Sequence, residues 1–212
     1  MSDKPDPCIT VLLVDDHSLV RRGFRRMLED DPQIRVVAEA SDGHDAVEAA
    51  GKLHPGVAVM DFALPSMNGA VATRHILKSS PETAVLILSM HSEPSYVRTC
   101  LDAGASGYLL KNAMDLELVE AVKRVAAGER VLDPRLGAIG DASKDRPVLT
   151  TRELEVLQLI VNGKSNREIA AVLGLSANTV AVHRANLMQT LGIHNTAELV
   201  VYAIREGLVS IA

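Results

Sequence analysis

The sequence predicts an α/β domain with a doubly wound parallel sheet, followed by a small all-α domain of four helices. Three observations support this fold class. Five short, nearly all-apolar runs alternate with amphipathic stretches up to Gly128. The segment from Asp133 to Val148 is rich in Pro, Gly, Ser and Asp, and no strand-like run follows it. Strands that are apolar on both faces are typical of parallel sheets covered by helices.

Each predicted element follows from its local pattern. The apolar runs are short and rich in Val, Ile and Leu, as buried parallel strands are. The stretches between them have the apolar spacing of amphipathic helices. Predicted strands cover residues 9–14, 34–38, 57–60, 84–88 and 107–110, and predicted helices cover about 18–30, 43–53, 68–78, 94–103 and 115–127.

The C-terminal part contains four helical segments. Three begin with a capping-box pattern, in which Ser, Thr or Asn is followed three residues later by Glu: Thr150 with Glu153, Ser165 with Glu168, and Asn195 with Glu198. The other helix is expected to begin at Ser176. Glycines stand where these helices should end, namely Gly163, Gly174, Gly192 and Gly207.

Composition excludes several classes of protein. Hydrophobic residues make up 47% of the 212 residues, which is enough for folded cores. The apolar runs are far shorter than the roughly 20 residues of a membrane span, and the first seven residues lack the pattern of a secretory signal. Two cysteines cannot form a disulfide framework. We therefore expect a soluble, cytoplasmic protein with no membrane partner.

The formal net charge of −5 is unevenly distributed. Residues 1–140 contain 15 basic and 20 acidic side chains, whereas residues 148–212 contain five of each. A neutral C-terminal domain lacks the basic footprint of many nucleic-acid binders, so any DNA-binding role must be argued from its helices.

Charged and polar side chains stand at the ends of the predicted strands. Asp15 and Asp16 end the first strand and Asp61 the third, while Ser89 and Lys111 end the fourth and fifth. Because the carboxyl ends of parallel strands line one crevice, these side chains are expected to meet there. Each aspartate alone could instead cap the following helix, but the coincidence of all five positions favours a shared site.

Such a crevice has the chemistry of phosphoryl transfer. Three carboxylates repel one another unless one is protonated or a cation is bound, and an all-oxygen site with room for water suits Mg²⁺. The cation and the lysine would neutralise phosphoryl oxygens, while a carboxylate could act as the nucleophile.

The motifs around these residues resemble the receiver domain of two-component response regulators, in particular the NarL/FixJ subfamily, over about residues 8–130. The resemblance rests on four segments: Val14-Asp15-Asp16-His17, Met60-Asp61 through Leu64-Pro65-Ser66-Met67-Asn68-Gly69, Leu88-Ser89-Met90-His91, and Gly104-Ala105-Ser106-Gly107-Tyr108-Leu109-Leu110-Lys111. It implies a flavodoxin-like (βα)5 fold with strand order 2-1-3-4-5. The run Phe62-Ala63-Leu64 departs from the family pattern and leaves the lifetime of an aspartyl phosphate open.

Carried over residue by residue, the resemblance makes Asp61 the phosphate acceptor. It implies that Asp16 binds Mg²⁺ directly and Asp15 partly through water. Asp61 and the backbone carbonyl of Ala63 would complete the protein ligands, and Lys111 would hold the phosphoryl oxygens.

The resemblance also implies a conformational switch. Ser89 is expected to move toward the phosphoryl group, and Tyr108 to follow it inward. His91 flanks the phosphoryl site, but a lone histidine there is more often a surface residue than a catalyst.

The C-terminal motifs resemble the LuxR-type helix-turn-helix over about residues 148–210. The matching segments are Leu149–Leu157, Gly163–Ala170, Leu175–Val180 and His183–Met188. The resemblance implies a scaffold helix at 165–173 and a recognition helix at 176–191 that enters the major groove of DNA.

A helical period of 3.6 residues divides the recognition helix into two faces. The face expected to pack contains Ser176, Val180, Leu187 and Leu191, and the small, uncharged face left for DNA contains Asn178, Ala181, Val182, Ala185 and Gln189. Ala and Val can contact thymine methyl groups, and Asn or Gln can read adenine. Phosphate contacts are expected from Lys164, Asn166, Ser176, Thr179 and Arg184.

Together the two resemblances imply a DNA-binding response regulator of a two-component system, which is not an enzyme acting on an external substrate. Its expected partners are a sensor histidine kinase as phosphodonor, double-stranded DNA with inverted-repeat half-sites, and a second copy of the chain when phosphorylated. Contact with RNA polymerase is left open. On the last helix, Leu199, Val200 and Ala203 could serve the core or a dimer contact.

Two other interpretations remain at this stage. The neutral outward face would also suit a regulator that acts by protein contact and has a DNA-silent output domain. A Mg²⁺-dependent phosphatase would use the same crevice, but Asp61 lacks a second carboxylate two residues on, and no cap domain is available. We predict a receiver domain at 8–130, a linker at 131–147 and a helix-turn-helix domain at 148–212.

Overall fold

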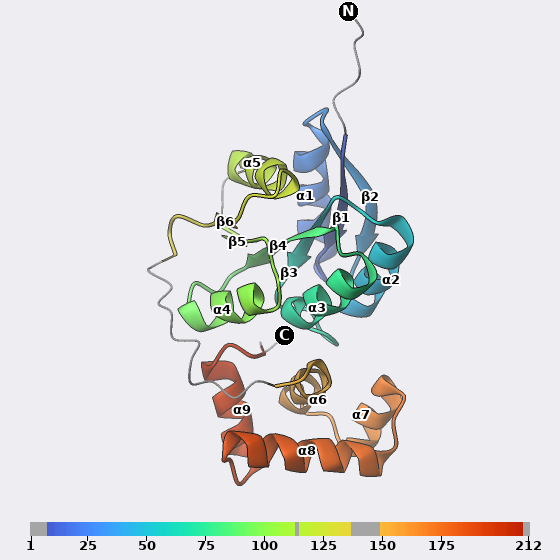
Figure 1. The fold of residues 1–212 in the computed structure, drawn as a ribbon, viewed down its shortest axis with the longest axis vertical. Coiled ribbons are helices and arrows are strands. Elements are labelled where there is room, and N and C mark those ends of the chain that lie inside the picture. The colour runs from blue at the N-terminus through green and yellow to red at the C-terminus, as the bar shows by residue number, and fades with distance from the viewer. Residues whose placement is uncertain (1–7, 113–114, 137–148, 210–212) are drawn as a thin grey trace, which may run out of the picture.

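The computed structural model describes residues 8–112, 115–136 and 149–209, which form a sheet domain and a helical domain (Figure 1). The strands are β1 (Ile9–Val14), β2 (Ile34–Ala40), β3 (Val57–Asp61), β4 (Ala84–Ser89), β5 (Gly107–Leu110) and β6 (Val131–Leu132). The helices of the sheet domain are α1 (Ser18–Glu29), α2 (Gly43–Leu53), α3 (Gly69–Ser79), α4 (Pro94–Asp102) and α5 (Asp115–Ala126). Those of the helical domain are α6 (Thr151–Val161), α7 (Asn166–Leu173), α8 (Ala177–Leu191) and α9 (Thr196–Arg205).

The sheet has the order β2-β1-β3-β4-β5-β6, and every pair of neighbouring strands is parallel. The predicted order 2-1-3-4-5 is confirmed, with one strand added at the edge. Strand β6 pairs Val131 with Gly107 and Leu132 with Tyr108. These two residues begin the segment 131–147 predicted as a linker, and residues 137–148 lie outside the described ranges.

Helices cover both faces of the sheet, with α1 and α5 on one face and α2, α3 and α4 on the other (Figure 1). Successive residues of β1 therefore enter different cores. Val11 and Leu13 pack with Leu28 of α1, whereas Leu12 and Val14 face α2 and α3. Residues 11–14 are each at most 1% exposed, which explains why this part of β1 is apolar on both faces.

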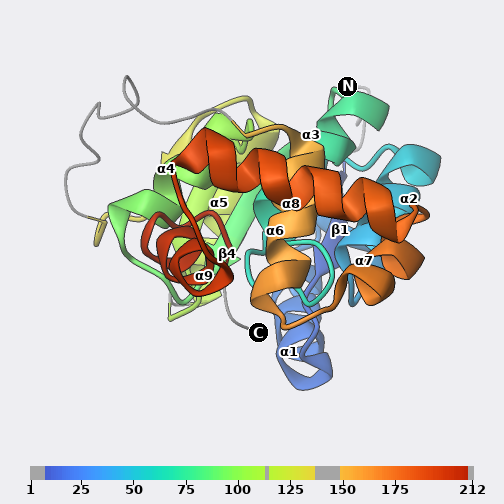
Figure 2. The same ribbon diagram turned by 90° about the horizontal axis from the view of Figure 1, so that it is seen from below.

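In the helical domain, α8 packs across α6 and α7 (Figure 2). The predicted capping boxes at Thr150 and Ser165 are both present, with reciprocal bonds to Glu153 and Glu168. The third box is not formed: Asn195 accepts from the Glu198 amide, but the Glu198 carboxylate accepts from the His194 amide instead. Asn195 has φ −147° and ψ 162°, so the chain enters α9 fully extended.

The helical domain packs on the α3–α4 side of the sheet domain through α6 and α9, and its core is continuous with the core of that face. A side-chain hydrogen bond joins the domains, with His75 Nε2 of α3 2.7 Å from Glu155 Oε1 of α6. Leu199 and Ala203 of α9 are fully buried, so they belong to the core. Helix α8 lies on the side remote from the sheet (Figure 1).

Within the described ranges, no helix combines the length and the apolar character that crossing a membrane requires.

Gly69, the first residue of α3, provides a stability test of the turn after β3. A Cβ atom there would lie 2.5 Å from the Asp61 carbonyl oxygen and 3.0 Å from Phe62 Cα, and both neighbours are backbone atoms. We expect Gly69→Ala to lower the free energy of unfolding by about 2 kcal/mol. Urea denaturation followed by circular dichroism measures this change.

The control is Gly23→Ala in α1, where the added methyl group has nothing within 4 Å. Because alanine favours helix, this variant should be as stable as the wild type or more stable by up to about 1 kcal/mol. Equal midpoints for the two variants would contradict the close-approach explanation.

Candidate functional site

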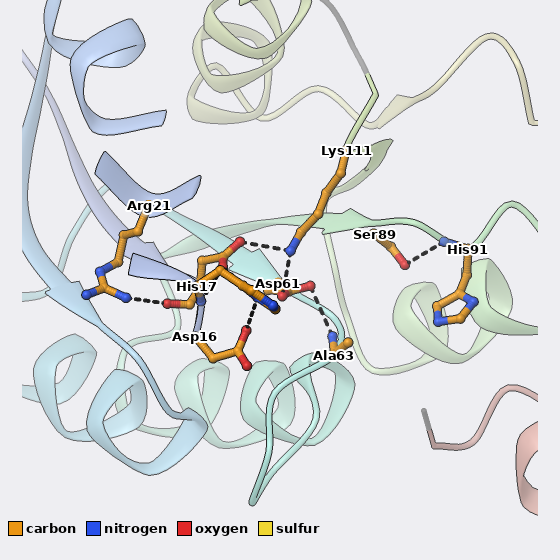
Figure 3. Close-up of polar contacts among 9 residues, drawn as sticks. Asp16, His17, Arg21, Asp61, Ala63, Ser89, His91 and Lys111 are labelled. Carbon is orange, nitrogen blue, oxygen red and sulfur yellow. Dashed lines mark hydrogen bonds and ion pairs between the residues drawn. The ribbon is translucent and has the colours of Figure 1, made fainter. Parts of the chain in front are cut away.

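The carboxyl ends of β1, β3 and β5 bring Asp15, Asp61 and Lys111 together. Figure 3 shows Lys111 pointing toward Asp61. The Lys111 ammonium lies between the two carboxylates, with Nζ 2.8 Å from Asp15 Oδ2 and 2.6 Å from Asp61 Oδ2. The Asp15 and Asp61 side chains are only 2% and 3% exposed. Two buried carboxylates so close together are stable only because a cationic group lies between them.

The environment shifts the protonation equilibria of this pair. Burial raises the pKa of Asp61, while Lys111 and the Ala63 amide act in the opposite direction without cancelling the effect. Burial alone would lower the pKa of Lys111, but the two carboxylates outweigh it and hold the pKa above its ordinary value. Ionised Asp61 is therefore less stable in the fold than in water, as is typical of a functional carboxylate.

Four side chains form a group that can hold a divalent cation: Asp15, Asp16, His17 and Asp61 offer ligand atoms that all lie within 4.8 Å of one another. Asp16 Oδ1 is buried without a hydrogen bond, although His17 Nδ1 approaches it to 2.7 Å. A buried carboxylate oxygen whose near polar neighbour is a single ring nitrogen can also accept a bound cation. The donor set, dominated by oxygen, therefore fits a hard divalent cation.

The loop between β3 and α3 supplies the next predicted site residue. The Ala63 amide donates to Asp61 Oδ1 at 3.1 Å, so this residue borders the acidic group as expected. The loop then turns back, because the amides of Leu64 and Gly69 both donate to the Phe62 carbonyl. The path after β3 is thus held by backbone bonds around Phe62.

The predicted switch residues lie on β4 and β5. Ser89 is buried, and its Oγ accepts from the His91 amide at 3.1 Å (Figure 3). Tyr108 is fully buried, and its hydroxyl donates to the His91 carbonyl at 2.7 Å. The tyrosine ring, which the resemblance implied would move inward, therefore already points inward in this structure. The His91 ring stacks on Tyr96 at a centroid distance of 4.1 Å.

Two residues near the site were missed by sequence reasoning. His17 joins the cation-binding group, and Arg21 Nη1 donates to the Asp15 carbonyl at 2.6 Å (Figure 3). Position alone could have indicated both, because His17 directly follows Asp16, and Arg21 lies one helical turn after His17 in α1.

The second predicted site lies on the outer surface of α8. The side chains expected to face DNA are all exposed, namely Asn178, Ala181, Val182, Ala185 and Gln189, whereas Val180 and Leu187 are fully buried. Ser176 is exposed rather than packed, and it caps α8 by accepting from the Thr179 amide. The exposed face is uncharged, as the sequence indicated.

The residues predicted to contact phosphate divide into two groups. Lys164 and Thr179 are exposed, and Lys164 lies 3.9 Å from a Glu168 oxygen. Arg184 instead donates to Asn166 Oδ1 and Thr196 Oγ1, so it holds α8 against α7 and α9. Two predicted DNA contacts, Asn166 and Arg184, thus bind each other in the free protein.

Comparisons with known proteins assign a family to each of the two domains. Residues 11–123 match the family of response regulator receiver domains, and residues 147–203 match the bacterial regulatory proteins of the luxR family. The transcriptional regulatory protein DegU of Brevibacillus brevis is 38% identical over 226 residues, covering 96% of each chain.

Solved structures of RcsB are similar over most of this chain. RcsB of Salmonella enterica serovar Typhimurium, bound to a promoter with the phosphomimetic BeF3⁻, is 27% identical (TM-score 0.64) and covers 96% of this chain and 99% of its own. Another RcsB structure holds two dimers on two parallel DNAs, with 27% identity, a TM-score of 0.59 and coverage of 93% and 98%.

The chain therefore belongs to the response regulators that combine a receiver domain with a LuxR-type helix-turn-helix domain. It is a DNA-binding response regulator of a two-component system and not a conventional enzyme. Neither the phosphatase interpretation nor the DNA-silent output domain gains support from these matches.

The raised pKa of Asp61 leads to a pH-dependent prediction. A carboxyl group whose pKa rises on folding keeps its proton more tightly in the native state, so its ionisation lowers stability above the ordinary carboxyl pKa of about 3.9. Without divalent cations, Asp61→Asn should raise the free energy of unfolding at pH 7 by on the order of 1 kcal/mol. The difference should shrink as the pH falls toward 4, which urea titrations at several pH values measure.

Asp45→Asn, at an exposed position in the first turn of α2, is the control. It should change stability by less than about 0.5 kcal/mol. A destabilised Asp61→Asn protein at pH 7 would show that the ion pair with Lys111 outweighs the burial of the carboxylate.

Proposed function

We propose that Asp61 accepts a phosphoryl group from a sensor histidine kinase and that this modification controls dimerisation and DNA binding. The observation that carries the proposal is the buried Asp61 carboxylate at the end of β3, which lies beside Lys111 and belongs to the group of side chains that can hold a cation. Asp61 Oδ2 lies 2.6 Å from the Lys111 ammonium, which can stabilise charge on a transferred phosphoryl group.

In the proposed reaction, an Asp61 carboxylate oxygen attacks the phosphorus of a phosphohistidine. A P–O bond forms, the P–N bond breaks, and the leaving imidazole takes a proton from water. Lys111 would orient and neutralise phosphoryl oxygens. Ser89, buried at the end of β4, would move toward the phosphoryl group and donate its hydroxyl to it. Asp15, Asp16, Asp61 and the Ala63 carbonyl would hold Mg²⁺, which supplies electrostatic stabilisation of the phosphoryl group when bound.

For the output domain, we propose that α8 enters the major groove of double-stranded DNA with inverted-repeat half-sites. Exposure of its uncharged face and the RcsB–DNA structures support this assignment. The dimer contact on DNA would be the outer surface of α9. Val201 is 63% exposed there, beside a hollow of about 440 Å³ lined by Ile193, Ala197, Tyr202 and Arg205.

We keep the domain limits 8–130, 131–147 and 148–212 as part of the proposal, together with the cytoplasm as the location where kinase and DNA are both accessible. The family matches at 11–123 and 147–203 support two units of this size. RNA polymerase is a further candidate partner of a DNA-bound regulator.

Phosphorylation is tested by incubating the full chain with Mg²⁺ and acetyl phosphate and separating the phosphorylated form on a phosphate-binding gel. Here the bond between phosphorus and the acetyl oxygen breaks and acetate leaves. The wild type should acquire one phosphoryl group, Asp61→Asn none, and Asp45→Asn as much as the wild type. Equal modification of Asp61→Asn and the wild type would refute the assignment of the acceptor.

DNA binding through α8 is tested with two opposite substitutions at the exposed Ala185. Each added lysine–phosphate contact should steepen the salt dependence of affinity by about one in log–log slope. We therefore expect Ala185→Lys to strengthen binding and Ala185→Glu to weaken it by about tenfold or more, as measured by fluorescence anisotropy with a duplex selected from a random pool. If both variants bind like the wild type, α8 is not the DNA-contacting surface.

A further inference from the structure

The helical domain holds the loop that follows Asp61. This acceptor loop, residues 62–68, begins directly after the proposed acceptor and ends at the N-terminus of α3. Asn162, at the C-terminal end of α6, donates from Nδ2 to the Pro65 carbonyl at 2.6 Å. The last residue of the loop, Asn68, is bound by the helical domain as well. Contacts from one domain thus restrain the segment that carries the proposed Ala63 ligand.

The side-chain amide of Asn68 binds α3 through its oxygen and the helical domain through its nitrogen. Its Oδ1 accepts from the Val71 amide at 2.9 Å and caps α3. Its Nδ2 donates to the Leu208 carbonyl at 2.9 Å and lies 3.4 Å from Gln158 Oε1. Because one partner is a backbone donor and the other a backbone acceptor, only one orientation of the amide satisfies both. Asn68 and Gln158 are both completely buried.

A second contact connects the helical domain with the other side of the site. The Tyr96 hydroxyl of α4 donates to the Ile204 carbonyl of α9 at 3.2 Å. The backbone of Gly207 lies against Tyr96, since a Cβ at this glycine would be 2.6 Å from the Tyr96 nitrogen. The Tyr96 ring stacks on His91, whose amide binds Ser89. The domain contact therefore borders the site at both β3 and β4.

The same docking leaves the recognition surface free. The outward residues of α8 are exposed while α6 and the chain after α9 contact the sheet domain. The docked arrangement thus does not act by covering the DNA-contacting face. The structural element that it restrains is the acceptor loop.

We propose that the Asn68 amide is a clasp through which the docked helical domain restrains the acceptor loop and so slows phosphorylation of Asp61. Asn68 is a positioning residue, because it touches neither the phosphoryl group nor the cation ligands. This inference rests on the proposed acceptor role of Asp61.

The direction of the effect follows from thermodynamic linkage. The docking contacts are made to the loop as it lies beside unmodified Asp61, with the Ala63 amide bonded to the Asp61 carboxylate. Phosphorylation must rearrange that bond, because the carboxylate oxygens then carry phosphorus or ligate the cation. Any restraint that favours the unmodified loop opposes the modification, and modification weakens docking by the same factor.

The test uses Asn68→Asp in the full chain. An aspartate still caps α3, but it places a carboxylate oxygen against the Leu208 carbonyl in place of the donor. We expect the docking equilibrium to shift by about tenfold or more toward separated domains. Small-angle X-ray scattering should show a larger radius of gyration, acetyl phosphate should modify Asp61 several-fold faster, and Mg²⁺ should bind more tightly.

Two further variants make the result interpretable. Asn162→Ala removes the bond to Pro65 from the side of the helical domain and leaves the α3 cap intact, so it should change all three measurements in the same direction. Asn195→Asp makes the matched exchange at the exposed cap of α9, where the retained oxygen still accepts from Glu198. It should behave as the wild type in all three measurements.

An Asn68→Asp protein that stays compact would overturn the clasp, and so would one that opens without faster modification. If the wild type and every variant remain unmodified, the acceptor role of Asp61 fails instead. In that case the scattering and Mg²⁺-affinity measurements still test whether Asn68 restrains the acceptor loop. An Asn68→Asp protein with separated domains and unchanged Mg²⁺ affinity would overturn the clasp.

Discussion

The Lys111 ammonium between Asp15 and Asp61 is the interaction on which the site depends. It joins the ends of β1, β3 and β5, so it requires those strands to be parallel and to end at one edge of the sheet. Both carboxylates are nearly inaccessible to water, and without a cation between them their ionised forms would be too costly to bury. The apolar strands supply the rigid frame that holds these three charges at hydrogen-bonding distance.

The same constraint shapes the chain that leaves β3. The Asp61 side chain points into the crevice, and its backbone carbonyl lies so close to α3 that residue 69 must lack a side chain. The acceptor loop is therefore short and bound at Phe62, and its far end is the buried cap Asn68. Only seven positions separate Asp61 from Asn68 at the domain contact, and no helix or strand lies between them.

The sheet and its helices could be predicted because each element carries its own periodic pattern. Strand β6 could not, since two residues have no periodicity and pair only because the chain returns beside β5. Asn195–Glu198 has the sequence of a capping box, yet the carboxylate binds the His194 amide instead. The positions of Asp15, Asp61 and Lys111 were predictable from strand ends. The bond between Arg184 and Asn166 was not, because it joins side chains of α8 and α7 that are 18 positions apart in sequence.

An exposed but uncharged recognition face constrains how DNA binding can be regulated. Arg184 is engaged with Asn166 and Thr196, and Lys164 lies near Glu168, so one copy offers few free cations to phosphates. A single copy should therefore bind weakly even though its α8 is accessible. Two linked copies on paired half-sites would bind DNA more tightly than one copy, because binding of the second copy becomes intramolecular once the first is bound. Under the proposed function, phosphorylation that promotes pairing would therefore change DNA occupancy more than uncovering α8, which is already exposed.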